Sequence, residues 1–229
     1  MRFEIVATAF DAIEKTAKRL DMTTQMAALL KETPASDARI VVYLTQGRLA
    51  PAYENTETGM GEKFVVHAIA KAAGYSKEDV EKRFKKTGDL GETAFELLSK
   101  KKQQALVMQT LSVKKVHDNF MKLAKITGEG TQDTKIKLLA ELLNFSTPTE
   151  AKFIIRFALG SLRLGVGDPT IMDSLARVHL KEFKERHPAL TKAIQEDKKH
   201  EKKEDDEIER KVQLKLREQI EAKYNIHSD

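Results

Sequence analysis

The stretch RFALGSLRLGVGDPTIMDSLARV, residues 156–178, places three glycines between two segments that otherwise have the apolar spacing of helices. Glycine commonly ends helices because it adopts left-handed backbone angles without strain, and Pro169 after Asp168 is typical of a helix start. The pattern predicts one helix that ends near Leu159 and another that begins at Asp168. Residues 147–150 (TPTE) predict the start of the first helix, through a capping box with proline at the first helical position.

Composition limits the class of protein. The chain has 229 residues, of which 41% are hydrophobic, with five prolines and no tryptophan, and helix-forming residues predominate throughout. We therefore expect an all-α protein. No apolar run is long enough to cross a bilayer and acidic residues occur too early for a signal peptide, so we expect a soluble, cytoplasmic protein without a membrane partner. Because cysteine is absent, a disulfide or thiolate metal site is excluded.

An internal repeat runs through the chain. Residues 59–62 (GMGE) align on residues 165–168 (GVGD), and apolar positions follow both segments at the same spacing. Two earlier pairs keep the same order, namely SDARIVVYL (36–44) with TEAKFIIRF (149–157) and FDAIEKT (10–16) with FMKLAKIT (120–127). Such a duplication predicts a compact multi-helix domain whose two halves are related by a pseudo-twofold axis.

The repeat suggests how the chain is organised. We expect one domain over 1–229, made of repeat 1 at about 1–73, a connector at 74–112, repeat 2 at about 113–180, and a charged segment with a C-terminal helix at 181–229. In this last part an apolar residue recurs every four positions, which predicts a helix with one narrow docking stripe. The stripe consists of Ile208, Val212, Leu216, Ile220 and Tyr224.

The glycine breaks fall at helix starts, where backbone N–H groups and the helix dipole favour anions. Arg163 lies in the turn between Gly160 and Gly165, and the net charge of the chain is +5. Both observations are compatible with a phosphate-rich partner. The alternative interpretation is that these glycines only end helices.

The stretch GEGTQDTK, residues 128–135, has the composition of a phosphate-binding loop but not its order. The P-loop pattern needs four residues between its first glycine and its Gly-Lys pair, and no strand is expected before this stretch. We therefore reject nucleotide binding here. Two interpretations remain open, which are ordinary helix capping and contact of a phosphate backbone with Gly128, Gly130, Thr131, Thr134 and Lys135.

His117-Asp118 is a dipeptide that metal-dependent helical phosphohydrolases combine with further His and Asp ligands. His67 and His179 could complete such a set, but the histidines show no H-E-x-x-H spacing. We therefore favour an exposed pair without a metal. A G-x-S-x-G nucleophile motif is also absent from the sequence.

Four segments together resemble one known family. They are EAKFIIRFALGSLRLGVGDPTIMDSLA (150–176), TGEGTQDTKIKLLAELL (127–143), GRLAPAYENTETGMGEK (47–63) and GDLGETA (88–94). On these motifs the chain resembles the N-terminal DNA-binding domain of archaeal and eukaryotic replicative ATP-dependent DNA ligases. The resemblance runs from about Phe3 to Asp229 and is weakest over 185–210. The start and the spacing look archaeal.

The resemblance implies an all-helical domain with internal pseudo-twofold symmetry, which grips nicked double-stranded DNA through the minor groove. The DNA-binding residues are then Gly59, Gly61, Lys63, Gly128, Gly130, Thr131, Thr134, Lys135, Gly160, Arg163, Gly165 and Gly167. The expected function is to hold DNA while ligase domains seal the nick in replication, repair and recombination. The alternative is a helical protein-interaction scaffold, and salt-dependent DNA binding would separate the two.

In this family the catalytic domains lie outside the DNA-binding domain. A nucleotidyltransferase domain carries a K-x-D-G motif, whose lysine takes AMP from ATP with Mg²⁺, and an OB-fold domain follows it. No K-x-D-G occurs in this sequence. We therefore expect part of a longer ligase that binds DNA without catalytic residues, metal or cofactor of its own, and that has the catalytic domains of the same polypeptide as partners.

Archaeal members often carry a sliding-clamp peptide, in which a glutamine is followed by a hydrophobic residue and paired aromatics. Here the segment KKQQALVMQTL keeps Gln103, Leu106 and Met108 without the aromatics. A sliding clamp is therefore predicted as a partner only from a degenerate motif.

Overall fold

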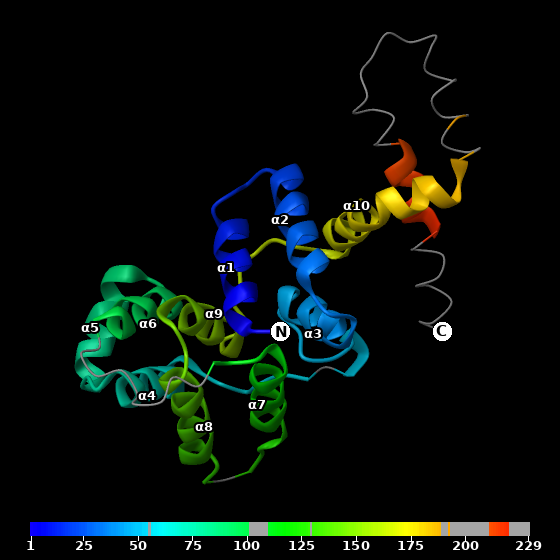
Figure 1. The fold of residues 1–229 in the computed structure, drawn as a ribbon. Coiled ribbons are helices and arrows are strands. Elements are labelled where there is room, and N and C mark those ends of the chain that lie inside the picture. The colour runs from blue at the N-terminus through cyan, green and yellow to red at the C-terminus, as the bar shows by residue number, and fades with distance from the viewer. Residues whose placement is uncertain (55, 101–109, 129, 189–191, 193–210, 220–229) are drawn as a thin grey trace. The chain divides into compact units, whose positions relative to one another are not determined.

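Helices make up the secondary structure of the described residues (Figure 1). The computed structural model describes residues 1–54, 56–100, 110–128, 130–188, 192 and 211–219. Within these ranges no strand forms, and a single isolated bridge joins Arg2 to Ser112. The all-α fold class predicted from the sequence is confirmed. None of the helices in these ranges is long and apolar enough to span a membrane.

The chain folds as two compact units, each built from two separate stretches of sequence. The first unit comprises Met1–Lys15 and Thr33–Gly165, and the second comprises Thr16–Glu32 and Val166–Asp229. The division of the chain into two repeats and a connector stays a prediction, because these units are defined by packing and not by sequence similarity.

The first unit holds most of the helices. In chain order they are α1 (Phe3–Glu14), α3 (Ala35–Thr45), the short 3-10 helix η1 (Ala52–Glu54), α4 (Glu62–Ala73), α5 (Lys77–Thr87), α6 (Leu90–Ser99), α7 (Val113–Lys125), α8 (Gln132–Asn144) and α9 (Pro148–Ala158). Helix α9 packs against α6 and α1, while α4 packs against α8 (Figure 1).

Helix α9 is the buried centre of the first unit. Every residue from Glu150 to Ala158 is buried, whereas most helices keep one polar face in water. The ring of Phe153 is fully buried and meets Phe10 edge-on, with 5.5 Å between the ring centroids. The predicted capping box at the start of the helix is confirmed, because Glu150 N donates to Thr147 Oγ1 and Thr147 N donates to the Glu150 carboxylate.

Two helix ends that the sequence repeat pairs share one turn structure. Helices α3 and α9 are each followed by a glycine in the left-handed region, Gly47 with φ 71° and Gly160 with φ 64°. In both turns the next N–H reaches back to the carbonyl five residues earlier, at 2.9 Å from Arg48 and 2.8 Å from Ser161. A duplicated segment would give this agreement of local structure. The pseudo-twofold axis itself stays a prediction.

The second unit contains α2 (Arg19–Glu32), α10 (Asp168–Arg186) and a helical stretch at 211–219. Helix α10 begins at the residue that the sequence predicts. It packs against α2 through Ser174, whose fully buried hydroxyl lies 2.6 Å from Thr170 O and 3.2 Å from Thr23 O. The small, hydrogen-bonded side chain allows the two helices to approach closely.

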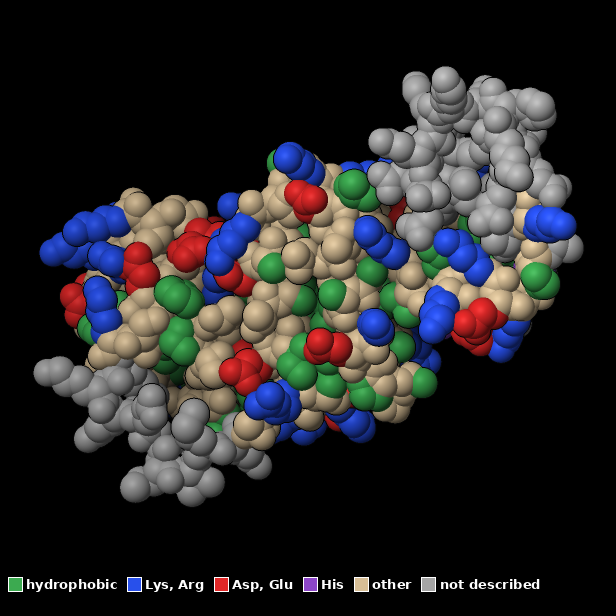
Figure 2. Space-filling view, turned by 45° about the horizontal axis from the view of Figure 1, so that its top comes forward, with side chains coloured by type: hydrophobic (Ala, Val, Ile, Leu, Met, Phe, Trp, Pro, Cys, Tyr) green, Lys and Arg blue, Asp and Glu red, His purple; other side chains and the backbone are tan. Residues whose placement is uncertain are grey.

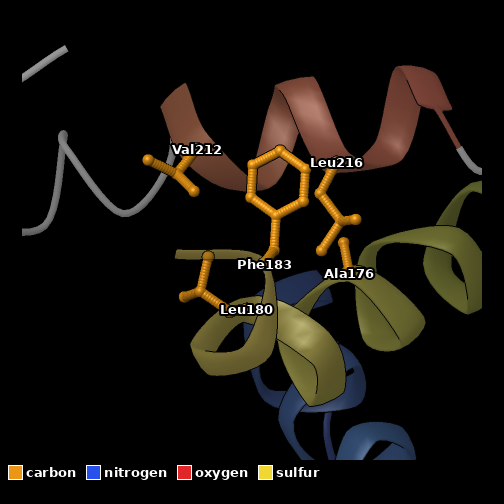
Figure 3. Packing of buried hydrophobic residues seen from close by; sticks show 5 residues of the cluster. All are labelled: Ala176, Leu180, Phe183, Val212 and Leu216. Carbon is orange, nitrogen blue, oxygen red and sulfur yellow. The ribbon is translucent and has the colours of Figure 1, made fainter. Parts of the chain in front are cut away.

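Residues 211–219 dock on α10 through an apolar cluster (Figure 3). The cluster consists of Ala176, Leu180, Phe183, Val212 and Leu216. Two members of the predicted docking stripe are therefore packing residues. The other three, Ile208, Ile220 and Tyr224, lie outside the described residues.

Candidate nucleic-acid interface

A hollow of about 490 Å³ lies in the first unit, between the turn after α3, the segment before α4 and the end of α9. Its lining consists of Gly47, Leu49, Thr56, Glu57, Thr58, Gly59, Met60, Gly61 and residues 157–160. Three of the predicted DNA-binding residues, Gly59, Gly61 and Gly160, are therefore brought together here. A larger hollow of about 590 Å³, between α4, α5 and α8, is lined by none of the predicted residues.

Thr58 holds the walls of the smaller hollow together. Its buried hydroxyl donates to Ala158 O at the end of α9, over 2.6 Å. Its carbonyl accepts from Lys135 Nζ in α8, over 2.9 Å. The end of α9, the segment before α4 and the start of α8 are thereby joined, and the predicted phosphate ligand Lys135 is placed beside the hollow.

Gly59 lies under the ammonium group of Lys135. Its φ of 61° is in the left-handed region, and a Cβ added here would lie 2.9 Å from Lys135 Nζ. Both observations favour glycine at this position. The sequence reasoning selected Gly59 as a DNA contact, but the structure adds that Gly59 also makes room for Lys135.

Arg163 follows α9 in an unusual backbone conformation. Its φ is 56°, and it is the one non-glycine with a positive φ among the described residues. The side chain is 69% exposed, and Nη1 lies 3.8 Å from Asp89 Oδ2. The predicted DNA-contacting arginine is therefore exposed on the first unit and has a fixed carboxylate as neighbour.

Helices α4 and α10 both begin at a glycine. Gly61 and Gly167 occupy the N-cap positions in extended conformation, and glycine has no side chain with which to cap the first turn. The N–H groups of a helix's first turn form a site for anions when no side chain caps them. The glycine two positions before each cap has a similar left-handed φ, 61° at Gly59 and 66° at Gly165.

The remaining predicted contacts lie away from the lining of the hollow. Thr131 donates its hydroxyl to Gly128 O over 2.8 Å, so it stabilises its own loop. Gly130 lies in the same loop, while Lys63 and Thr134 are exposed in the first turns of α4 and α8. Gly167 belongs to the second unit. DNA contact by each of these residues stays a prediction.

Sequence reasoning missed a group of charges in which two buried cations meet partly buried carboxylates, and which we call the ion cluster. It consists of Asp11 and Glu14 from α1, Asp89 and Glu92 from α6, and Lys152 and Arg156 from α9. Lys152 Nζ lies 2.6 Å from Glu14 and 2.8 Å from Glu92, and Arg156 Nε lies 3.1 Å from Asp89. The cluster joins the three helices.

Gly91 allows α6 to approach α9 closely enough for this cluster. An added Cβ would lie 2.7 Å from Lys152 O and 2.8 Å from Arg156 Cγ, which is closer than real Cβ atoms come. Asp89 caps α6 in the same turn, because its Oδ1 accepts from Glu92 N over 3.0 Å. Burial raises the pKa of Asp89, but the hydrogen bonds from Glu92 N and Arg156 outweigh burial and hold the pKa below its ordinary value.

The prediction of an exposed His117-Asp118 pair is wrong for His117, whose side chain is 16% exposed and belongs to the packing of the first unit. Its Nε2 lies 2.8 Å from Leu49 O, so the ring on α7 fixes the loop that follows α3. Asp118 is paired with Lys114 over 2.9 Å. Across the described ranges, no three His, Cys, Asp or Glu side chains are grouped so that they could hold a metal ion.

Basic side chains are spread over one face of the molecule. Figure 2 shows, on the face drawn there, Lys and Arg side chains standing among acidic and uncharged ones. A phosphate-binding surface on this face would therefore use separate cations set between backbone groups.

The fold and the site define an all-α protein in which glycine turns line a hollow and Lys135 lies beside it. The chain belongs to the family described as DNA ligase N terminus, whose model matches residues 2–176. The resemblance found in the sequence motifs is thereby confirmed for these residues. Its predicted continuation over residues 177–229 stays a prediction.

Archaeal relatives agree with this assignment. A DNA ligase of Nitrosopumilus maritimus is 40% identical over 176 residues, which cover 77% of this chain and 30% of the relative. A DNA ligase of Acidianus ambivalens is 42% identical over 185 residues, covering 77% and 31%. A protein of Thermofilum pendens named DNA ligase 2 is 43% identical over 181 residues, covering 76% and 30%. The chain thus spans about 30% of the length of these relatives.

Proposed function

We propose that this chain is the DNA-binding region of an ATP-dependent DNA ligase, which grips nicked duplex DNA by backbone contacts along the minor groove. The observation that carries the proposal is the grouping of Gly59, Gly61 and Gly160 around one hollow, with Lys135 beside it. Glycine lets main-chain N–H groups approach a sugar-phosphate edge, which a Cβ would hold away. Such contacts position a protein on DNA without reading its bases.

Further residues would contact DNA in the proposal, Gly167 from the second unit and the others from the first. Arg163 and Lys63 are exposed cations that would contact phosphates directly. Gly165 and Gly167 would present main-chain groups before α10, as Gly59 and Gly61 do before α4. Gly128, Gly130 and Thr131 in the loop before α8, and Thr134 in its first turn, would add contacts to the DNA strand that lies nearest to this helix.

The whole protein would seal nicks with ATP and Mg²⁺ in replication, repair and recombination, acting on chromosomal DNA in the cytoplasm. The relatives named DNA ligase support this proposal. The lysine that accepts AMP would lie in catalytic domains of the same polypeptide, because no K-x-D-G occurs in this sequence. A sliding clamp would be a further partner, but Gln103, Leu106 and Met108 lie outside the described residues.

Equilibrium titration of the chain with intact and nicked duplexes at several salt concentrations tests DNA binding. If about six phosphates are neutralised, log K should fall with log salt with a slope near −5, independently of base sequence. The absence of duplex binding at low salt would favour a protein-interaction scaffold.

Incubation with labelled ATP and Mg²⁺ tests where catalysis lies. We expect no covalent AMP on this chain and no sealing of a nick. Covalent label would show that the nucleotide-accepting lysine is in this sequence and that the division between binding and catalysis is wrong.

A further inference from the structure

Arg163 carries a backbone strain that its own contacts do not explain. A left-handed φ of 56° is costly for a residue with a Cβ, and glycine would adopt it freely. The side chain is 69% exposed, so it contributes little packing, and its pair with Asp89 at 3.8 Å is too exposed and too long to stabilise the fold strongly. Strain that persists without compensation at an exposed position points to a function of the side chain.

Asp89, in contrast, is held on every side. Its side chain is 13% exposed, caps α6 through Glu92 N and accepts from the buried Arg156. Gly91 in the same turn packs directly on the α9 backbone. The carboxylate is therefore a fixed anion at the edge of the ion cluster, and Arg163 is an exposed cation within ion-pair distance of it.

We propose that Asp89 is a positioning residue for DNA binding, which orients the guanidinium of Arg163 before a phosphate arrives. The inference rests on the proposed function. A guanidinium has five donors in a rigid plane, so a carboxylate near one edge leaves the remaining N–H groups directed outward. Because the ion pair with Asp89 restricts the directions that the side chain takes, less of its rotamer freedom is lost when it binds a phosphate.

The direction in which Asp89→Asn changes the DNA affinity distinguishes this role from a simple charge effect. Asp89→Asn removes a negative charge from a surface that approaches a polyanion, and by electrostatics alone this tightens DNA binding. If Asp89 orients Arg163, the same substitution weakens binding. Asparagine keeps the cap of α6 because it serves as well as aspartate at an N-cap position.

The experiment compares wild type, Asp89→Asn, Arg163→Gly and the double variant in titrations with nicked duplex. We expect Asp89→Asn to weaken binding by roughly three- to tenfold, the factor that corresponds to ordering one long side chain. In the Arg163→Gly background the effect of Asp89→Asn should be opposite, so that the substitution slightly increases the affinity for DNA. Arg163→Gly should itself weaken binding while raising the melting temperature, since glycine relieves the strain.

Two further variants control the interpretation. Glu81→Gln removes a similar charge from an exposed side chain on α5 that does not line the hollow, and it should leave binding unchanged or tighter. Arg163→Lys keeps the charge without the planar fork, and it should weaken binding even if Asp89→Asn unfolds too easily to be measured. Lysine that binds as well as arginine would overturn the inference.

The possible failures are distinguishable. If wild type binds duplex and Asp89→Asn binds it more tightly, the positioning role is wrong while the proposed function stands. If wild type does not bind duplex at all, the proposed function itself fails.

Discussion

The ion cluster and the exposed turn after α9 use one carboxylate in two different environments. Asp89 meets Arg156, whose side chain is 10% exposed, and Arg163, whose side chain is 69% exposed. Arg156 is surrounded by Asp89, Glu14 and Glu92, whereas among the described residues Arg163 has Asp89 alone at ion-pair distance. The guanidinium of Arg156 thus stabilises the fold, whereas the guanidinium of Arg163 is exposed and accessible to a ligand.

Burial decides which role a cation has. Removing one partner of a buried pair leaves a charge without compensation and costs about 3–5 kcal/mol, while an exposed pair contributes about 0–1 kcal/mol. Substitutions in the two regions should therefore affect different measurements. Stability should depend on the ion cluster and DNA affinity on the turn.

The largest effect is expected for Arg156→Ala. The substitution leaves the partly buried carboxylates of Asp89 and Glu14 without their guanidinium, so we expect the free energy of unfolding to fall by about 3 kcal/mol. Urea unfolding followed by circular dichroism measures this. A loss below about 1 kcal/mol would mean that water or rearrangement compensates the carboxylates, and the contrast between the two regions would be lost.

The pH dependence of the free energy of unfolding also reports the contribution of the ion cluster to stability. The pKa of Asp89 is lower in the folded state than its ordinary value of 3.8, so its contribution is present above pH 3.8 and is lost as the pH falls through the folded value. Burial lowers the pKa of Lys152, but hydrogen bonds to Glu14 and Glu92 outweigh it and raise the pKa above 10.5. Its contribution is therefore present below pH 10.5 and is lost as the pH rises through the folded value.

We therefore expect the ion cluster to contribute a constant stability between these limits and to lose it beyond each of them. Unfolding by urea at a series of pH values measures this profile. Asp89→Asn is the matched control, because it removes the contribution of that carboxyl. In this variant the free energy of unfolding should fall less steeply as the pH is lowered. If the free energy of unfolding falls equally steeply at low pH in this variant and in wild type, the pKa of Asp89 does not change on folding.

Local signals in the sequence were sufficient for the helix boundaries examined. The capping box before α9 and the Asp168-Pro169 start of α10 depend on residues adjacent in the chain, and both predictions hold. The ion cluster was not predictable in this way. Asp89 pairs with Arg156, and with 40 basic and 35 acidic residues in the chain the sequence does not indicate which of them meet.

The candidate site was predictable in part. The glycines and cations were selected by position in a repeat and by resemblance, and Gly59, Gly61 and Gly160 do line one hollow. No signal in the sequence indicates that Thr58 joins the walls of this hollow, because its two partners, Ala158 and Lys135, become neighbours only through packing. Nor could it show that Arg163 is strained, since φ is a property of the folded turn.

Gly59→Ala and Gly61→Ala form a matched pair of intermediate effect. Gly59 has a left-handed φ and Lys135 Nζ above it, so alanine should cost about 1–2 kcal/mol of stability. Gly61 has no such φ and no described atom within 4 Å of an added Cβ, so alanine should cost at most about 1 kcal/mol, through its poorer N-cap propensity. Thermal melting separates the two variants.

Both alanines put a methyl group at the hollow, so both should weaken duplex binding if main-chain groups approach the DNA there. Gly61→Ala is the more informative variant, because its fold is least disturbed. Wild-type affinity in Gly61→Ala would remove the close approach of DNA from the proposed function.

The smallest effect on stability, and the clearest effect on binding, is expected for Arg163→Ala. Alanine keeps the left-handed strain and loses only an exposed side chain, so the free energy of unfolding should change by less than about 0.5 kcal/mol, against about 3 kcal/mol for Arg156→Ala. If the guanidinium meets a phosphate, the salt dependence of log K should flatten by about one unit, and affinity should fall alike for duplexes of every sequence. Titrations of both variants at several salt concentrations, well below their melting temperatures, make the comparison. An unchanged slope in Arg163→Ala would leave the turn with the single role of ending α9, because a cation that touches no phosphate releases no counterion when DNA binds.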